Sequence, residues 1–302
     1  MRKAVRLRPL GQRLARALGW LWLLAFVLAP LVVVVKISLS QSALAQPPYT
    51  PVFDTFGDLA TKLRDFSLDA YSGLFDDTLY LDSYLTSLRL AAISTALALL
   101  VAYPLAYAIS RAPARWKPTL VLLAVAPFWT SFLIRVYAWI AILKDEGFLN
   151  HALMALGIIH EPLPIFASET AVVIGIVYSY LPFMILPVFN AIDRQDRSLV
   201  EAAADLGASP RSAFWRITVP LSRPGIVAGC LLVFIPAVGE FVIPDLLGGS
   251  ETLMIGRTLW NDFFENRDWP SAAAAAIVLL ALLVIPLLLV ERAQLRAMEG
   301  DR

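Results

Sequence analysis

The chain has 302 residues, of which 59% are hydrophobic and 16% are charged. Soluble domains contain about 45–50% apolar and about 25% charged residues, so this composition excludes cytosolic enzymes, secreted enzymes and nucleic-acid-binding modules. Lys and Arg number 25 against 24 Asp and Glu, so the net charge of +1 says little about partners. The single cysteine, Cys230, excludes an intrachain disulfide. The sequence predicts an integral membrane protein.

Apolar runs of bilayer length predict six membrane-spanning helices. A helix needs about 20 apolar residues to cross a hydrocarbon core of about 30 Å. Two predicted spans contain charged residues, which are Arg135 in one and Glu240 and Asp245 in the other. The six spans, in chain order, are residues 17–35, 90–110, 118–143, 170–192, 224–247 and 269–290.

Two apolar segments have alternatives to an ordinary membrane span. The first span is followed by Ala43–Ala45, a signal-peptidase-like site, but its apolar run exceeds the usual length and Lys36 intervenes, so we expect an uncleaved anchor. Residues 148–159 are too short to cross, and we expect an interfacial helix there, capped by Asn150.

Lys and Arg are distributed unequally between the two sides of the predicted bundle. Seventeen lie in the termini and in the second and fourth connections, against at most seven in the other three connections. Because positive residues accumulate on the cytoplasmic side, both termini are predicted to be cytoplasmic.

The chain carries no recognisable energy source of its own. It has no Gly-x-x-x-x-Gly-Lys nucleotide-binding motif. His151 and His160 lie in one external connection without partners at metal-ligand spacing, so no metal site is predicted. No plausible nucleophile–base pair is present either, which argues against an enzyme. Transport would therefore depend on an ion gradient or on a partner.

The fourth connection, residues 193–223, has the pattern of a short helix, a turn and a second helix. Ser198 and Glu201 have the spacing of a capping box, and Gly207 is suited to a left-handed stop. Ser209 and Pro210 are suited to the start of the second helix, which we expect to end at Pro220. Its Phe214 and Trp215 would offer an apolar anchor to a partner.

This connection resembles the EAA signature of permease subunits of binding-protein-dependent ABC importers. The matching positions are Glu201, Ala202, Ala203, Asp205, Gly207, Ile217 and Pro220, while Val219 stands where Leu is usual. The resemblance implies a type I importer permease fold, all-α with six transmembrane helices. It also implies that these residues form a coupling helix that docks on an ATP-binding subunit.

The resemblance extends from about residue 87 to residue 290 and points to polyamine permeases, with putrescine permeases the nearest. It is carried by residues 127–139, 234–249, 254–257 and 266–270. It implies location in the bacterial inner membrane with an ATPase dimer, a second permease and a periplasmic polyamine-binding protein as partners. ATP and Mg would be bound by the ATPase, and no cofactor by this chain. Spermidine or another small solute is the alternative substrate, and an ion-coupled secondary transporter is the alternative class.

The resulting organisation has four parts. Residues 1–37 form a basic cytoplasmic N-terminus with the first span, and residues 38–86 form a periplasmic loop region. Residues 87–291 form the core of five helices, including the coupling loop 193–223, and residues 292–302 form a cytoplasmic tail.

Two charged residues are expected at similar depth in the membrane. At about 1.5 Å per residue, Arg135 lies roughly 27 Å along its helix and Glu240 roughly 24 Å along its own. Either the two side chains pair and fix the packing, or Glu240 or Asp245 faces the passage and contacts substrate ammonium groups.

Aromatic and acidic residues extend the candidate passage. Tyr137, Trp139 and Trp260 could provide cation–π contacts, or serve as core and interfacial residues. The predicted external connections carry 15 acidic residues, a field that would attract a cation but that also follows from the depletion of Lys and Arg.

Overall fold

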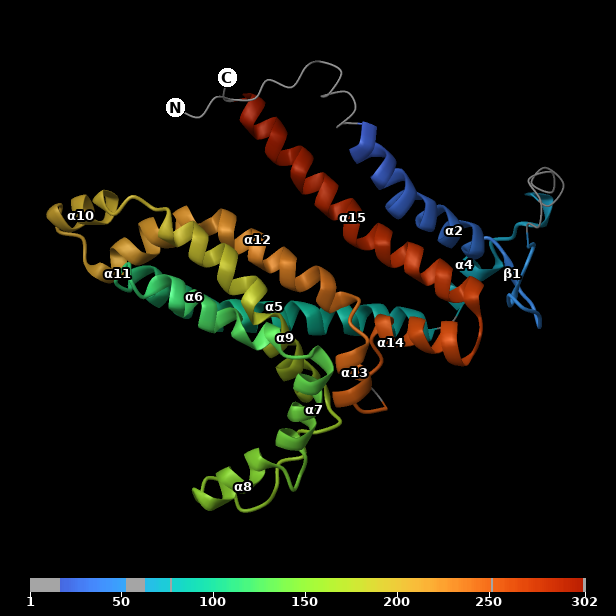
Figure 1. Cartoon of the computed structure of the whole chain (residues 1–302), viewed down its shortest axis with the longest axis horizontal. Coiled ribbons are helices and arrows are strands. Elements are labelled where there is room, and N and C mark those ends of the chain that lie inside the picture. Colours follow the sequence, from blue (N-terminus) through green and yellow to red (C-terminus); the bar gives the residue numbers. More distant parts are fainter. Residues whose placement is uncertain (1–16, 53–62, 77, 251, 301–302) are drawn as a thin grey trace. The chain divides into compact units, whose positions relative to one another are not determined.

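The computed structural model describes residues 17–52, 63–76, 78–250 and 252–300, most of which are helical (Figure 1). The chain forms two compact units, one made of Met1–Leu81 with Leu259–Arg302 and the other of Asp82–Thr258. The predicted division at residues 37, 86 and 291 follows membrane topology, which these contacts do not test, and it stays a prediction.

The first unit joins segments from both ends of the chain. Helix α15 packs along α2 and against α4, where Ala274 and Ala275 allow close approach to Leu74. The two strands pair antiparallel, with Gln41 opposite Thr50. The elements are η1 Leu24–Leu28, α2 Ala29–Ser38, β1 Gln41–Ser42, β2 Tyr49–Thr50, η3 Leu63–Asp65, α4 Asp69–Asp76, η6 Asn261–Glu265 and α15 Trp269–Gly300.

The second unit contains the longer helices of the chain. Its elements are α5 Thr78–Arg111, α6 Lys117–Val125, η4 Ala126–Trp129, α7 Phe132–Leu143, α8 Phe148–Ala155, α9 Glu169–Asp193, α10 Ser198–Asp205, α11 Pro210–Ala213, η5 Phe214–Thr218, α12 Val219–Val238, α13 Val242–Leu247 and α14 Ile255–Trp260. Helices α5 and α14 each extend across the boundary between the units. The hydroxyl of Ser168 caps α9 by accepting a hydrogen bond from the Ala171 amide at 3.3 Å.

The core of this unit lies between α5, α9 and α12. Ala98, Ala102 and Ala106 recur every four residues along α5 and are fully buried. They face larger residues, namely Met184, Ile185, Val188 and Ile192 of α9 and Val233 of α12. Small residues on one helix let the backbones approach closely, which is the usual way that helices associate in a membrane.

Among the residues that the structure describes, four helices are long and apolar enough to cross a membrane, and each contains all or much of a predicted span. They are Ala17–Ser38, Thr78–Arg111, Glu169–Asp193 and Pro210–Val238. Helices Lys117–Trp129 and Phe132–Ala155 would count as a fifth span only as a pair, and Trp269–Ile285 is a shorter apolar helix. The all-α fold is confirmed, whereas the count of six spans stays a prediction.

Two predicted spans are not straight helices. The chain bends by 87° between Trp129 and Phe132, where Thr130 and Ser131 have extended backbones. The predicted span 224–247 is wrong as a continuous helix because α12 ends at Val238 and a separate helix, α13, begins at Val242. Both interruptions follow prolines, Pro127 and Pro236, which cannot donate a backbone hydrogen bond.

Helix α8 confirms the short helix expected after the third span, but the predicted cap is wrong. The N-cap residue is Gly147, whereas Asn150 is buried inside the segment. The Asn150 amide donates hydrogen bonds to the carbonyl oxygens of Lys144 and Leu163, and its oxygen accepts one from the Leu163 amide at 2.9 Å. Asn150 therefore joins α8 to the chain that follows it.

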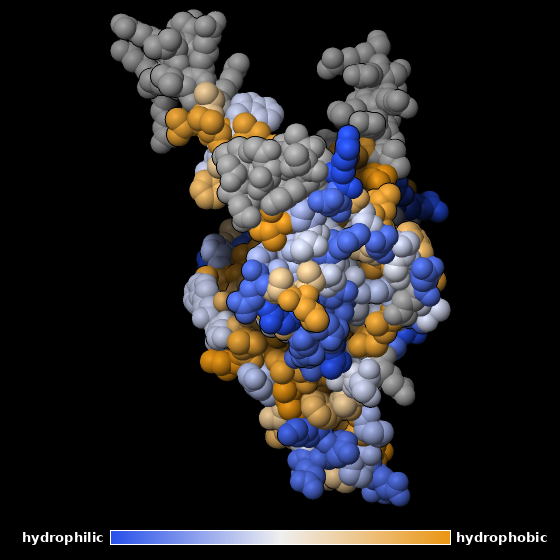
Figure 2. All heavy atoms as spheres, turned by 90° about the vertical axis from the view of Figure 1, so that its right-hand side faces the viewer, coloured by the Kyte–Doolittle hydropathy of each residue, from blue (hydrophilic) through white to orange (hydrophobic). Residues whose placement is uncertain are grey.

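Many large apolar side chains lie on the surface, as the orange atoms in Figure 2 show. Examples are Trp20 and Phe26 of the first helix and Leu100 of α5, each 67–69% exposed. A water-soluble monomer does not carry so much contiguous apolar surface, so these faces are suited to contact with lipid or with other membrane helices.

Helices α9 and α12 pack so closely that Gly225 has no room for a side chain. A Cβ atom added there would lie 2.4 Å from Ala191 Cβ and 2.5 Å from the Pro187 carbonyl oxygen. We predict that Gly225→Ala destabilises the protein by about 1–3 kcal/mol, the usual cost of overpacking. The melting midpoint of the detergent-purified protein measures this effect. Gly73→Ala is the matched control because a Cβ atom at Gly73 meets nothing within 4 Å, and an equal midpoint for the two variants would contradict the prediction.

Candidate functional site

The break between α12 and α13 places Glu240 inside the second unit. Helix α12 ends at Val238 and α13 begins at Val242, so Glu240 lies in the middle of the three-residue linker Gly239–Phe241. Its side chain is 8% exposed although it carries a carboxylate. A buried charge is costly unless polar groups surround it, so the contacts of this carboxylate are informative.

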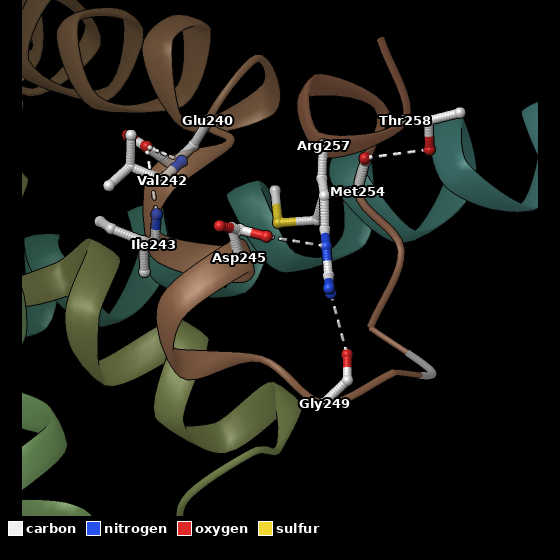
Figure 3. Close-up of polar contacts among 8 residues, drawn as sticks. All are labelled: Glu240, Val242, Ile243, Asp245, Gly249, Met254, Arg257 and Thr258. Atoms are coloured by element: carbon white, nitrogen blue, oxygen red, sulfur yellow. Dashed lines mark hydrogen bonds and ion pairs between the residues drawn. The ribbon is translucent and has the colours of Figure 1, made fainter. Parts of the chain in front are cut away.

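The Glu240 carboxylate is held by hydrogen-bond donors from two directions, of which Figure 3 shows the backbone amides of Val242 and Ile243. One oxygen, Oε1, accepts from the backbone amides of Val242 at 3.0 Å and Ile243 at 3.4 Å. The other oxygen, Oε2, accepts a hydrogen bond from the hydroxyl of Tyr180 on α9. The carboxylate thus satisfies amides exposed by the helix break and links that break to α9.

Arg135 on α7 is also buried, with 8% exposure. Its guanidinium carbon lies 4.9 Å from the centre of the Phe128 ring and 5.7 Å from that of Phe132, both cation–π distances. Among the residues that the structure describes, its Nε and Nη1 atoms have no hydrogen-bond partner. The guanidinium is therefore packed against rings without a polar partner for these two atoms.

Arg135 and Glu240 line one cavity of about 550 Å³. The other residues of its wall come from η4, α7, α9, α12, the linker and the start of α13, and are Phe128, Phe132, Ser179, Tyr180, Phe183, Pro236, Gly239, Phe241 and Val242. The volume falls within the range of about 300–1,000 Å³ that is common for small-molecule sites. The similar depth predicted for the two charges is consistent with this shared cavity.

The pairing of Arg135 with Glu240, one of the two alternatives that the sequence leaves open, is absent from the described part of the chain. Glu240 instead bonds Tyr180 and two amides, and Arg135 stacks on phenylalanine rings. The pairing was expected because charges buried in a membrane are normally paired. Aromatic rings and backbone donors take the place of the partner here, and a sequence does not reveal either of them.

Asp245 points away from the break and pairs with Arg257 (Figure 3). Arg257 Nε lies 3.3 Å from Asp245 Oδ1, and its Nη1 donates to the Gly249 carbonyl oxygen at 3.1 Å. The Asp245 side chain is 51% exposed. Arg257 therefore holds α13 and the start of the following loop to α14.

The three candidate aromatic residues differ in their surroundings. Tyr137 is 56% exposed on α7, whereas Trp139 packs edge-on against Tyr178 of α9 at 5.3 Å. Trp260 belongs to the first unit, where its ring lies 4.1 Å from that of Phe264. None of the three is among the residues that line the cavity around Glu240.

The segment 193–223 begins with a helix, α10, that contains no buried residue. The predicted capping box is wrong: Arg197 is the N-cap residue, and the Asp196 carboxylate accepts a hydrogen bond from the Ser198 amide at 3.0 Å. That backbone hydrogen bond lowers the pKa of Asp196 because it stabilises the ionised carboxylate. Glu201 lies in the first turn and is exposed.

The predicted stop at Gly207 is confirmed. Gly207 has φ +84°, and its amide donates to the Ala204 carbonyl oxygen while the Ala208 amide donates to that of Ala203. This pair of hydrogen bonds is the Schellman motif. The cap of the next helix is also confirmed, because the Ser209 hydroxyl accepts from the Ser212 amide with Pro210 in the first turn.

The second helix of the segment does not end at Pro220, and that prediction is wrong. Helix α11, the π-helical turn η5 and α12 form one apolar helix, Pro210–Val238, in which Pro220 lies in the first turn of α12. Phe214 is half-buried, and its ring packs edge-on against Tyr103 and Tyr107 of α5. Trp215 is 67% exposed and remains available.

Residues 20–298 match the family described as the binding-protein-dependent transport system inner membrane component. The chain belongs to this family. It is a permease subunit of a binding-protein-dependent ABC importer and not an enzyme, and the permease is an inner membrane component with several apolar helices.

Relatives of the permease include transport proteins named for polyamines. The spermidine/putrescine transport system permease protein PotB of Escherichia coli is 40% identical over 272 residues, which cover 90% of this chain and 94% of PotB. PotB of Haemophilus influenzae is 39% identical over 276 residues, which cover 90% and 91%. The resemblance to polyamine permeases is thereby confirmed.

A solved structure supports the fold of the permease. The crystal structure of a bacterial ABC transporter involved in the import of the acidic polysaccharide alginate aligns with a TM-score of 0.69 at 16% identity. The alignment covers 94% of this chain and 95% of that one. The type I importer permease fold is therefore confirmed.

Sequence reasoning named Arg135 and Glu240 but none of the other nine residues of the permease's cavity wall, among them Tyr180 and Phe183. Both lie on α9, a predicted span without charged residues, so nothing in its composition singled them out. Their spacing of three places them on one face of that helix. The sequence could have pointed to this face of α9 only if the break after α12, which brings Glu240 to it, had also been predicted.

Proposed function

We propose that the permease carries putrescine into the cell, together with an ATPase dimer, a second homologous permease and a periplasmic polyamine-binding protein. The names of its PotB relatives, which include both spermidine and putrescine, support a polyamine. The observation that carries the proposal is the cavity in which the Glu240 carboxylate lies among aromatic rings. A carboxylate and ring faces are the groups that recognise an alkylammonium ion.

In this proposal Glu240 contacts a substrate ammonium group during passage. Asp245, Arg135, Tyr137, Trp139 and Trp260 are the further candidates for contact along the route. Asp245 is half-exposed and already paired with Arg257, so an incoming ammonium would compete with a guanidinium there. High affinity is not needed in the passage, since the binding protein can supply selectivity.

The ATPase would dock on α10 and the turn after it, on the cytoplasmic side with both termini. Glu201, Ala202, Ala203, Asp205 and Gly207 belong to that exposed segment, with Leu206 90% exposed at its end. Ile217 and Pro220 lie further along, at the start of the long helix Pro210–Val238. ATP and Mg would be held by the ATPase, and this chain would bind no cofactor. An exposed apolar side chain at a rigid turn is suited to a groove on a partner.

Gly207 provides a test of this coupling role. We predict that Gly207→Val lowers ATP-dependent uptake at least tenfold, because a β-branched residue is strained at φ +84°. A Cβ atom at this position meets nothing within 4 Å, so the backbone alone is responsible. Gly207→Asn is the matched control, since Asn tolerates this conformation.

Glu201→Arg, which reverses an exposed charge on α10, should reduce uptake in the same way without preventing membrane insertion. Uptake into proteoliposomes and co-purification of the ATPase are the measurements. Normal ATPase association and transport in both Gly207→Val and Glu201→Arg would show that the segment is only a connection.

Glu240 provides a test of the passage. We predict that Glu240→Gln reduces putrescine uptake about tenfold or more, the effect of losing one charge-assisted hydrogen bond. The Gln oxygen can still accept from the Val242 amide, so the fold and the ATPase activity of the complex should persist. Uptake of labelled putrescine by a complex of verified composition measures the loss, and unchanged uptake would exclude a role in passage.

Competition distinguishes the two polyamines in the same assay. If putrescine is the substrate, unlabelled putrescine suppresses uptake at lower concentration than spermidine does. The reverse order would make spermidine the substrate, as the names of the PotB relatives also allow.

A further inference from the structure

The guanidinium of Arg135 is a buried cation that lacks a counter-ion in the described part of the chain. Two of its nitrogen atoms are enclosed and have no hydrogen-bond partner, and its carbon lies over the rings of Phe128 and Phe132. Charged side chains inside membrane proteins face a partner or a water-filled cavity. Arg135 lines the cavity of about 550 Å³ described above, so a group that enters this cavity meets its charge.

Glu240 is the acidic residue of the cavity wall, and aromatic rings connect it to Arg135. The Phe128 ring packs edge-on against Phe183 at 5.0 Å, and Phe183 lies 6.1 Å from Tyr180. Tyr180 then donates its hydroxyl hydrogen to Glu240. The two opposite charges are therefore placed at the ends of a series of ring contacts and are not joined to each other.

An aliphatic ammonium ion would use the same groups as Arg135. Ring faces attract a compact cation as they attract a guanidinium, and the carboxylate attracts both. Without Arg135 the cavity wall would have a net charge of −1, whereas with it the charges of the wall cancel. The cavity therefore binds a diamine more weakly with Arg135 in its wall than the rings and the carboxylate would bind it without Arg135.

We propose that Arg135 sets the affinity of the cavity: it occupies the cation's place on the rings and, through its charge, prevents a diamine from being retained beside Glu240. This inference rests on the proposed function and adds to it the reason why the cavity releases its cargo. Arg135 competes with the substrate ammonium group for the aromatic rings of the cavity. The substrate is therefore bound only weakly after the binding protein delivers it, and it can leave the cavity when the passage opens to the other side.

Equilibrium binding of labelled putrescine to the purified permease–ATPase complex in nanodiscs, without the binding protein, tests this role. We expect Arg135→Gln to bind putrescine about tenfold more tightly than the unsubstituted complex, because a like charge near the ligand is removed. Arg135→Lys keeps the charge and should bind as weakly as the unsubstituted complex. In the double variant Arg135→Gln/Glu240→Gln, the tenfold gain in affinity for putrescine should disappear. Arg115→Gln, the same change at an exposed position outside the cavity, should have no effect.

Several outcomes would overturn the inference. One is an assembled Arg135→Gln complex that binds putrescine no more tightly, and another is a gain that persists when Glu240 is also replaced. If Arg135→Gln does not assemble, Arg135→Met supplies a neutral side chain of similar length. If neither assembles while Arg135→Lys does, the positive charge is needed only for packing of the complex, and the inference is wrong. Failure of the proposed function is distinguishable, because the unsubstituted complex with its binding protein would then not transport putrescine at all.

Discussion

The Glu240 carboxylate stabilises the break between the long helix Pro210–Val238 and the short helix α13. In a membrane, exposed amides at a helix break have no water to bond, and a carboxylate has no water to solvate its charge. Here each satisfies the other, since Glu240 accepts from the amides of Val242 and Ile243. The Tyr180 hydroxyl completes the arrangement and fixes the break to α9. The cavity lined by Arg135 and by the rings of η4, α7 and α9 depends on this arrangement.

The same helix joins the two regions to which we assign function. Helix Pro210–Val238 starts directly after the exposed turn at Gly207 and ends at the residue before the Gly239–Phe241 linker. Its 29 residues correspond to about 43 Å at 1.5 Å per residue. Movement of the α10 segment by a docked ATPase would therefore reach the cavity through one continuous element. The edge-on contacts of Phe214 with Tyr103 and Tyr107 hold the start of this helix against α5.

The predictions that succeeded rest on local chemistry. Gly207 and Ser209 were identified because a left-handed stop and an N-cap have strong residue preferences, and both are found as expected. The long apolar helices followed from the hydropathy of runs such as residues 170–192. Family and fold followed from motifs that extend over most of the chain.

The predictions that failed overlooked alternative local structures in two places and contacts between distant parts of the chain in a third. Pro220 was expected to end a helix, but the π-helical turn before it accommodates the proline and the helix continues. Asp196, two residues before Ser198, supplies the bond that a capping box would have made. Arg135 and Glu240 share a cavity without pairing, because the rings of Phe128 and Phe132 and the hydroxyl of Tyr180 take the places of the partners.

We propose that the chain provides a passage and a docking segment, and that its ATPase partner provides the driving force. Proteoliposomes that contain the two permeases, with and without the ATP-binding subunits and with ATP at the α10 side, test it most directly. Supplied with loaded binding protein, only vesicles with the ATP-binding subunits should accumulate putrescine above its external concentration. Equal accumulation by vesicles that lack those subunits, driven by an imposed ion gradient, would contradict the account.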